Sequence, residues 1–256
     1  MKLFRHFLLI GFLFFWMAPS LKAQEPASHH YIFKTEPERT ALLELYTSEG
    51  CSSCPPAHEW FTKLKKSERI WVDFVPVAFH VDYWDSQGWK DNLSNPEATR
   101  RQRVYARFWG ANSIFTPAMM LNGEEWTGWS KGIDVYNAPK LSGVMTVERF
   151  ADDYAIKFVP AEGLEGKNWV ANIALLGFNI RSKIDDGENR GRVLENDFAV
   201  LAFKTHKMEK YSSGSQARIN LSTRDSPILA DKYGLAVWVN AEDNPLPVQA
   251  AGGFAG

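Results

Sequence analysis

The stretch at residues 43–57, LELYTSEGCSSCPPA, constrains the fold more than any other part of the chain. It contains the only two cysteines, Cys51 and Cys54. The residues before them are apolar and β-prone on both parities, as in a strand buried on both faces. Pro55 and Pro56 follow, and the first turn of a helix tolerates proline. This order predicts a buried strand, then the cysteine pair, then a helix.

A pair of thiols at the start of a helix has a physical basis as a redox centre. With Cys51 at the helix N-terminus, free backbone N–H groups and the helix dipole would lower the pKa of its thiol. Cys54, one turn further along, would then act as the resolving thiol. The motif alone leaves two alternatives open, half of a metal site and an inert structural disulfide.

The residues after the pair continue the alternation of strands and helices. A second long strand is predicted over residues 70–81 and a helix over residues 96–109. The dipeptide Asn122-Gly123 then favours a two-residue hairpin turn between two short strands. We therefore expect an α/β domain over residues 39–142.

The texture of the chain changes near residue 143. Short runs rich in Val, Ile, Phe and Ala follow one another, separated by turn signals such as Asp186-Gly187. Several strands at this spacing, without a helical period, are typical of a β-sandwich or β-meander. We expect residues 143–256 to form a separate β-rich, sandwich-like domain.

The N-terminal residues have the pattern of a secretory signal peptide, expected over residues 1–23. A basic segment precedes an apolar run at residues 7–17, and Ala23 offers a small residue at the cleavage edge. The run is shorter than the ~20 residues of a spanning helix, although an uncleaved membrane anchor is the alternative. Residues 24–38 are expected to form a polar leader. We expect a soluble periplasmic or secreted protein without a stable membrane anchor, starting near Gln24.

Charge and motif content narrow the function classes. Without the predicted signal peptide the chain has 26 basic and 30 acidic residues, a formal charge of −4. This balance gives no support for a nucleic-acid partner. The sequence has no nucleophile elbow, P-loop or dinucleotide fingerprint, so no cofactor is expected. In an oxidising compartment the cysteines will form a disulfide unless something reduces it.

A proline far from the cysteines is the next candidate for the site. Thr116-Pro117 precedes the predicted hairpin, where a cis-proline loop facing the cysteines would lie. A cis bond there would expose the backbone of Thr116 for strand-like pairing with a substrate peptide. The alternative is a trans turn proline with no role in the site.

The segment FHVDYWD leaves the second predicted strand at the same sheet edge as the cysteines. His80 and Asp82 share strand parity, so we expect them to point together. His80 is then a proton shuttle, a third ligand for zinc or copper(I) beside the two cysteines, or a buried histidine bonded to Asp82. Asp82 or Asp85 is a candidate base for deprotonating Cys54.

Several motifs together resemble a family of bacterial secreted proteins catalogued as a domain of unknown function: ELYTSEGCSSCPPA, AFHVDYWD, GWKD, RRQRVYA, TPAMMLNG and GENRGR. The resemblance implies a thioredoxin-like fold with Cys51 and Cys54 opposite a cis-proline at Pro117, and a β-rich C-terminal part. Thr116 before the proline is also similar to extracytoplasmic disulfide isomerases. The fold class expected for the chain is therefore α/β, a thioredoxin-like domain followed by the β-rich domain.

The function that these features favour is thiol–disulfide exchange. Cys51 attacks a protein or small-molecule disulfide, Cys54 resolves the mixed disulfide, and the Thr116-Pro117 loop holds the partner chain. The Ser-Ser pair between the cysteines differs from the dipeptides of well-studied thiol oxidoreductases, so the direction of exchange stays open. The alternatives are a metallochaperone that uses the cysteines with His80, and a non-enzymatic binding module.

Overall fold

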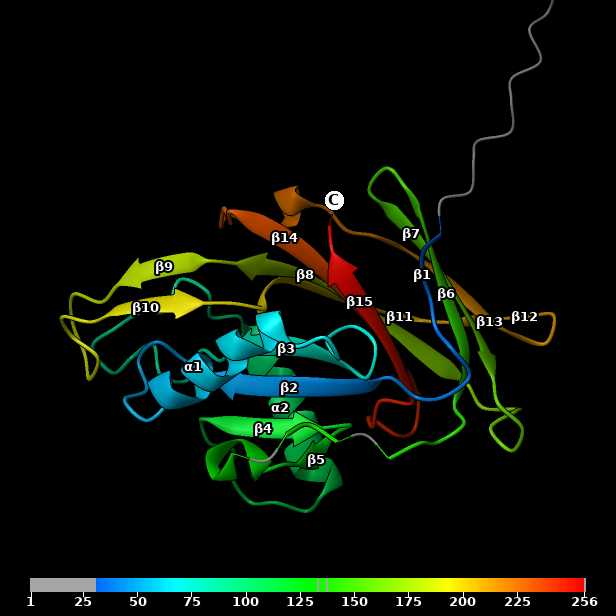
Figure 1. Cartoon of the computed structure of the whole chain (residues 1–256), viewed down its shortest axis with the longest axis horizontal. Helices are drawn as coiled ribbons and strands as arrows, with labels where there is room; N and C mark the ends of the chain where they lie inside the picture. The colour runs from blue at the N-terminus through cyan, green and yellow to red at the C-terminus, as the bar shows by residue number, and fades with distance from the viewer. Residues whose placement is uncertain (1–30, 133, 137, 256) are drawn as a thin grey trace, which may run out of the picture.

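The chain forms strands over most of its length (Figure 1). The structure is a computed structural model that describes residues 31–132, 134–136 and 138–255. The α-helices are α1 (Pro55–Lys63) and α2 (Pro96–Phe108). The strands are β1 (Tyr31–Lys34), β2 (Ala41–Thr47), β3 (Phe74–His80), β4 (Ala118–Leu121), β5 (Glu124–Glu125), β6 (Gly143–Phe150), β7 (Asp153–Pro160), β8 (Trp169–Phe178), β9 (Ile180–Lys183), β10 (Val193–Asn196), β11 (Ala199–Lys207), β12 (Glu209–Tyr211), β13 (Gly214–Asn220), β14 (Lys232–Ala241) and β15 (Gln249–Phe254).

An eight-stranded mixed sheet is the centre of the fold. Its order is β15-β14-β8-β11-β3-β2-β4-β5. Strand β2 pairs in parallel with β3 and antiparallel with β4. Strand β3 also pairs in parallel with β11, where Ala78 lies opposite Ala199. The sheet thus joins strands from the first and second halves of the sequence.

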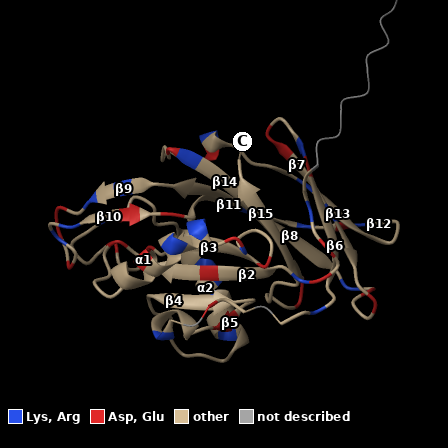
Figure 2. Ribbon diagram, viewed as in Figure 1, with Lys and Arg blue, Asp and Glu red and all other residues tan. Residues whose placement is uncertain are grey.

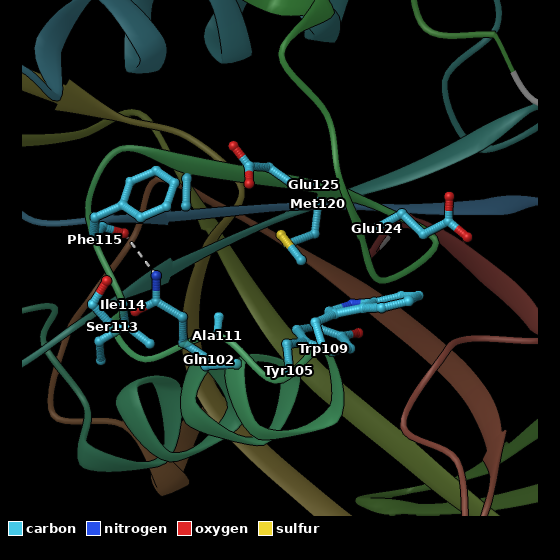
Figure 3. A pocket seen from close by; sticks show the side chains of 12 residues that line it. Gln102, Tyr105, Trp109, Ala111, Ser113, Ile114, Phe115, Met120, Glu124 and Glu125 are labelled. Carbon is cyan, nitrogen blue, oxygen red and sulfur yellow. Dashed lines mark hydrogen bonds between the residues drawn. The ribbon is translucent and has the colours of Figure 1, made fainter.

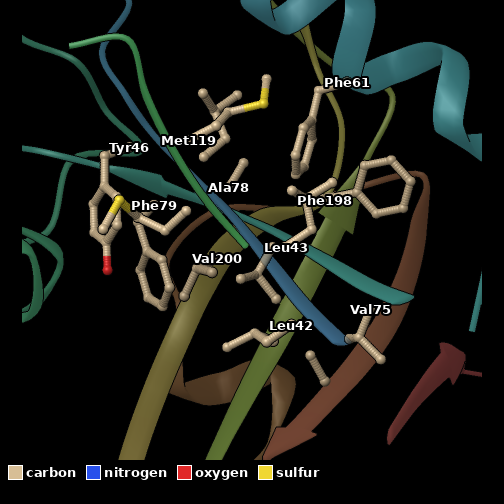
Figure 4. Packing of buried hydrophobic residues seen from close by; sticks show 14 of the residues in the cluster. Leu42, Leu43, Tyr46, Phe61, Val75, Ala78, Phe79, Met119, Phe198 and Val200 are labelled. Atoms are coloured by element: carbon tan, nitrogen blue, oxygen red, sulfur yellow. The ribbon is translucent and has the colours of Figure 1, made fainter. Parts of the chain in front are cut away.

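A second, five-stranded sheet of order β1-β6-β7-β13-β12 packs on one face of this sheet. Alternation along β8 shows the two faces: Ile173 and Leu175 belong to the core between the sheets, whereas Ala174 and Leu176 belong to the core on the opposite face. Figure 4 shows the second core, in which side chains of β2 and β3 pack with Phe61 of α1 and with residues of β11.

The predicted fold class is wrong. We expected an α/β, thioredoxin-like domain followed by a separate β-rich domain, but the molecule is a predominantly β structure with few helices. Strands β2 to β5 are one end of the eight-stranded sheet and not the sheet of an α/β domain. The prediction failed because β3 and β11 meet through residues that are far apart in the chain, and local sequence patterns do not report such pairing.

Local predictions in the same region were accurate. Helix α2 begins at Pro96, and the side chain of Asn95 caps it by accepting from the backbone N–H of Glu97 at 2.8 Å. Asn122 and Gly123 both have positive φ, 54° and 81°, between the antiparallel strands β4 and β5. Both elements depend on interactions between near neighbours in the sequence.

The predicted signal peptide at residues 1–23 lies outside the described residues. Of the expected polar leader, Tyr31–Lys34 forms β1, which pairs antiparallel with β6. Within the described part of the chain, no helix has the length and apolarity needed to cross a membrane. Basic and acidic residues are interspersed along the ribbon (Figure 2).

Candidate active site

The cysteines lie in the turn that connects β2 to α1. Helix α1 begins at Pro55, and Cys54 is its N-cap residue, so the expected position of Cys51 at the helix N-terminus is wrong by one turn. Pro55 and Pro56 occupy the first helical positions and have no N–H to offer a thiolate. The turn is closed instead by the Cys54 N–H, which donates to the Cys51 carbonyl oxygen at 3.2 Å.

The two thiols differ sharply in acidity. Both cysteines are reduced, and each is only 1% exposed. A hydrogen bond from Cys54, supported by Ser53 and Thr116, lowers the pKa of Cys51 to about 6 against the opposing effect of burial. Burial and the neighbouring Cys51 sulfur raise the pKa of Cys54 far above its usual value. Cys51 therefore ionises first.

The loop before β4 supplies the neighbour of Cys51. The Cys51 thiol donates to the Thr116 carbonyl oxygen at 3.7 Å, and the Thr116–Pro117 peptide bond is cis. The hydroxyl of Thr116 accepts from the indole Nε1–H of Trp84 at 2.8 Å. Thr116 is thus held beside the sulfur by its backbone and by its side chain.

His80 and Asp82 do not form the pair that strand parity suggested. His80 is buried, and its Nδ1 bonds Asp91 Oδ2 at 2.7 Å. Asp82 instead accepts from the hydroxyl of Thr99 on α2 at 2.5 Å. The prediction failed because β3 ends at His80, so strand alternation no longer governs Asp82.

A second histidine lies closer to the cysteines in the hydrogen-bond network. His58, on α1, has its Nε2 at 2.7 Å from Thr47 Oγ1, and the hydroxyl of Thr47 hydrogen-bonds Cys54. The rings of His58 and His80 lie 5.4 Å apart between centroids. Burial, with the charge of His80, lowers the pKa of His58 to about 3, whereas Asp91 raises the pKa of His80 against the effect of burial. The two rings therefore differ in charge at neutral pH.

The loop between β9 and β10 covers the backbone of the cysteine turn. The side-chain amide of Asn189 donates to the carbonyl oxygens of Glu49 and Cys51 at 2.8 and 2.9 Å. The Glu188 carboxylate accepts from the Ser52 N–H at 3.0 Å, which lowers the pKa of Glu188. Residues of the second half of the chain are therefore part of the site.

Sequence reasoning assigned no role in the site to His58, Asp91, Glu188 or Asn189. Asp91 is the last residue of GWKD, and Glu188 and Asn189 belong to GENRGR, so two of the quoted motifs contain them. His58 follows Cys54 by four residues, which is one helical turn. That spacing was the one signal for His58 in the sequence.

The alternative metal site is not assembled. Among the residues that the structure describes, no group of three or more His, Cys, Asp and Glu side chains is arranged to hold a metal ion. The imidazole of His80 is bonded to Asp91 and does not complete a site with the two thiols. The geometry of this region is that of a dithiol beside a histidine network.

A cavity of about 430 Å³ lies on the other side of the Thr116 loop (Figure 3). Phe115, the residue before Thr116, forms one wall, and its carbonyl oxygen accepts from Gln102 Nε2 at 2.7 Å. Met120 and Trp109 supply further apolar lining, and the carboxylates of β5 lie beside it. An apolar group of a bound molecule can therefore be accommodated one residue away from the contact of Cys51.

Two solved structures share the fold of this chain. A protein from Agrobacterium tumefaciens, determined by X-ray crystallography, matches with a TM-score of 0.55 and 23% identity, covering 86% of this chain and 95% of its own. HBP35 of Porphyromonas gingivalis matches with a TM-score of 0.58 and 11% identity, covering 86% of this chain and 76% of its own. At these identities the likeness concerns the fold alone.

The comparison with curated proteins found no match. The comparison with protein families did find one: residues 42–240 match a protein family of unknown function, DUF1223. The matched region extends from strand β2 to strand β14, so it includes the cysteine turn, the Thr116 loop and the loop between β9 and β10. The chain therefore belongs to the DUF1223 family.

Proposed function

We propose that this protein is an extracytoplasmic thiol–disulfide oxidoreductase. The observation that carries the proposal is the asymmetry of the two adjacent thiols: Cys51 has a pKa of about 6, and burial raises the pKa of Cys54. At neutral pH the first is a thiolate, the form that attacks disulfides, and the second is a thiol kept in reserve. An inert structural disulfide has no need of this difference.

The reaction would proceed in two exchanges. The Cys51 thiolate attacks a substrate disulfide, forms a mixed disulfide and releases one substrate thiolate. Cys54 then attacks the Cys51 sulfur and releases the second, which leaves the substrate reduced and the protein oxidised. The reverse sequence oxidises a substrate dithiol. The Thr116 loop and the cavity behind Phe115 are suited to a polypeptide substrate, whose apolar side chain would occupy the cavity.

The location outside the cytoplasm is part of the proposal and derives from the N-terminal residues, with their basic start and apolar run. Cell fractionation of the full chain, with N-terminal sequencing of the product, tests it. A mature start near Gln24 in the extracytoplasmic fraction is expected. An uncleaved chain in the cytoplasm would contradict it.

Insulin reduction by the pre-reduced protein tests the chemistry. We expect Cys51→Ser to abolish turnover, and Cys54→Ser to accumulate a mixed disulfide with the substrate. The alkylation rate of Cys51 should rise with pH through about 6, because only the thiolate reacts. No exchange above background by the protein with both thiols reduced would rule the function out.

A further inference from the structure

The sulfur of Cys54 has polar neighbours that the two-exchange scheme does not use. The hydroxyl of Thr47 and the backbone N–H of Ser48 both hydrogen-bond it, and both stabilise its thiolate against burial and the nearby Cys51. Thr47 is 0% exposed and Ser48 is 1% exposed, so solvent does not compete for these contacts. Both residues lie at the end of β2, on the rigid edge of the sheet.

The hydroxyl of Thr47 has a single proton, so its two contacts determine its direction. His58 Nε2 lies 2.7 Å from Thr47 Oγ1. The low pKa of His58 keeps the imidazole neutral at physiological pH, when one ring nitrogen carries a proton. With that proton on Nε2, His58 donates to Thr47, and the Thr47 proton is then directed at the Cys54 sulfur.

We propose that the Thr47 hydroxyl and the Ser48 N–H form a two-donor site that stabilises the Cys54 thiolate during resolution, with His58 as the positioning residue for Thr47. The proposal rests on the proposed thiol–disulfide exchange. In this step the Cys54 sulfur bonds to the Cys51 sulfur, and the bond between Cys51 and the substrate sulfur breaks. The substrate thiolate leaves with the electron pair, and the proton lost by Cys54 ends on it, so no further oxidant is needed.

The physical need for such a site follows from the position of Cys54. A buried thiol does not ionise readily, because its charge is removed from water. Preorganised donors aimed at the atom where charge develops lower the barrier without any reorganisation during the reaction. Thr47 touches the reacting sulfur and is therefore a catalytic candidate, whereas His58 acts through it.

Reaction of the reduced full chain with dithiobis-nitrobenzoate separates the two exchanges. Attack by Cys51 releases one coloured aryl thiolate, and attack by Cys54 on the resulting mixed disulfide releases the other. Stopped-flow absorbance with one equivalent of reagent should therefore show two phases. Cys54→Ser, which lacks the resolving thiol, identifies the second phase by abolishing it.

Thr47→Val keeps the shape of the side chain and removes the donor. We expect it to slow the second phase at least about tenfold, which corresponds to about 1.4 kcal/mol, and to leave the first phase unchanged. Thr47→Ser should restore the second phase, because it restores the hydroxyl. His58→Leu should slow the same phase by a smaller factor, since Thr47 is then free to turn its proton away.

An unchanged second phase in Thr47→Val would overturn this proposal and leave the oxidoreductase function standing. Absence of both phases in the wild-type protein would reject the oxidoreductase function itself. Should Thr47→Val not fold, as judged by circular dichroism, Thr47→Ala and Thr47→Ser are compared in a Cys51→Ala background. The ultraviolet absorbance of the Cys54 thiolate must then titrate at a higher pH in Thr47→Ala than in Thr47→Ser, and equal titrations would overturn the proposal.

Discussion

Two clusters of buried polar side chains lie on opposite faces of strand β2 and differ in how completely their members are paired. The Glu44 cluster consists of Glu44, Tyr46, Arg101 and Tyr105, and it faces α2. The Cys54 cluster consists of Thr47, Cys54, His58, His80 and Asp91, and it faces α1. The alternation of side chains along β2 separates them, since Glu44 and Tyr46 have one parity and Thr47 the other.

The Glu44 cluster is closed. Glu44 Oε1 accepts from Arg101 Nε at 2.7 Å and from the Tyr46 hydroxyl at 3.0 Å, and Oε2 accepts from the Tyr105 hydroxyl at 2.6 Å. The guanidinium of Arg101 also lies 4.9 Å from the ring centroid of Trp238 on β14. The positive and negative charges balance, so this cluster ties α2 and strands of both halves to β2.

The Cys54 cluster is incomplete. His80 Nε2 is buried without a hydrogen-bond partner among the described residues, and the Cys54 thiol has a neighbour, Cys51, that ionises in its place. Both clusters shift pKa values: burial raises those of Tyr46 and Tyr105 just as it raises that of Cys54. Perturbed acidity alone therefore does not mark a reactive site, and unmatched groups beside a nucleophile distinguish the two cases.

The strongest predicted change breaks the closed cluster. Arg101→Met leaves the Glu44 carboxylate buried without its counter-ion, which should lower the free energy of unfolding by about 3–5 kcal/mol. Urea unfolding under reducing conditions measures it. Arg100→Met on the exposed side of the same helix is the matched control and should cost less than about 1 kcal/mol. Equal losses in the two variants would show that the cluster does not stabilise the fold.

A more moderate change distinguishes the Cys54 cluster by its response to acid. The pKa of His58 is about 3 in the folded protein, against 6.5 for an unperturbed histidine, so the unfolded chain binds a proton that the folded protein does not bind. The free energy of unfolding should therefore fall by about 1.5 kcal/mol between pH 6.5 and pH 5, following the ~1.36 kcal/mol equivalent of one pKa unit.

His58 is the histidine that acts in this window. The raised pKa of His80 contributes stability that is complete below its unfolded pKa and is lost as pH rises through its folded pKa. The lowered pKa of Asp91 matters only below about pH 4. His58→Gln should abolish the decrease in urea-unfolding measurements at the two pH values, and His206→Gln, at an exposed position, should retain it. A decrease of the same size in His58→Gln would contradict the assignment.

The weakest predicted change concerns the exposed edge of the Cys54 cluster. Glu188 places a negative charge on the Ser52 N–H, close to the Cys51 thiolate that it disfavours. Glu188→Gln should therefore lower the pKa of Cys51 by a few tenths of a unit. The pH profile of iodoacetamide alkylation measures this shift. Asp185→Asn, in the same loop and without a contact to the cysteine turn, is expected to leave the profile unchanged; equal shifts would point to a general charge effect.

Prediction from the sequence succeeded where the determining contacts are local. The Asn95 cap, the start of α2 at Pro96 and the Asn122-Gly123 turn each depend on neighbours within a few residues. It failed for His80, whose partner Asp91 is eleven residues away across a loop, and for the clamp of Asn189 on the cysteine turn. No local pattern reports which distant side chain fills a given hydrogen bond.

Local sequence was enough to establish the order of strand, cysteine turn and helix, because apolar periodicity and the two prolines act on the chain segment that contains them. The fold class, in contrast, depends on tertiary pairing, because the single contact of β3 with β11 merges the two halves into one sheet. The acidity of the thiols depends on packing in the same way. The prolines of α1 leave Cys51 without first-turn amides, and Ser53, Thr116 and Cys54 supply its hydrogen bonds from the folded surroundings.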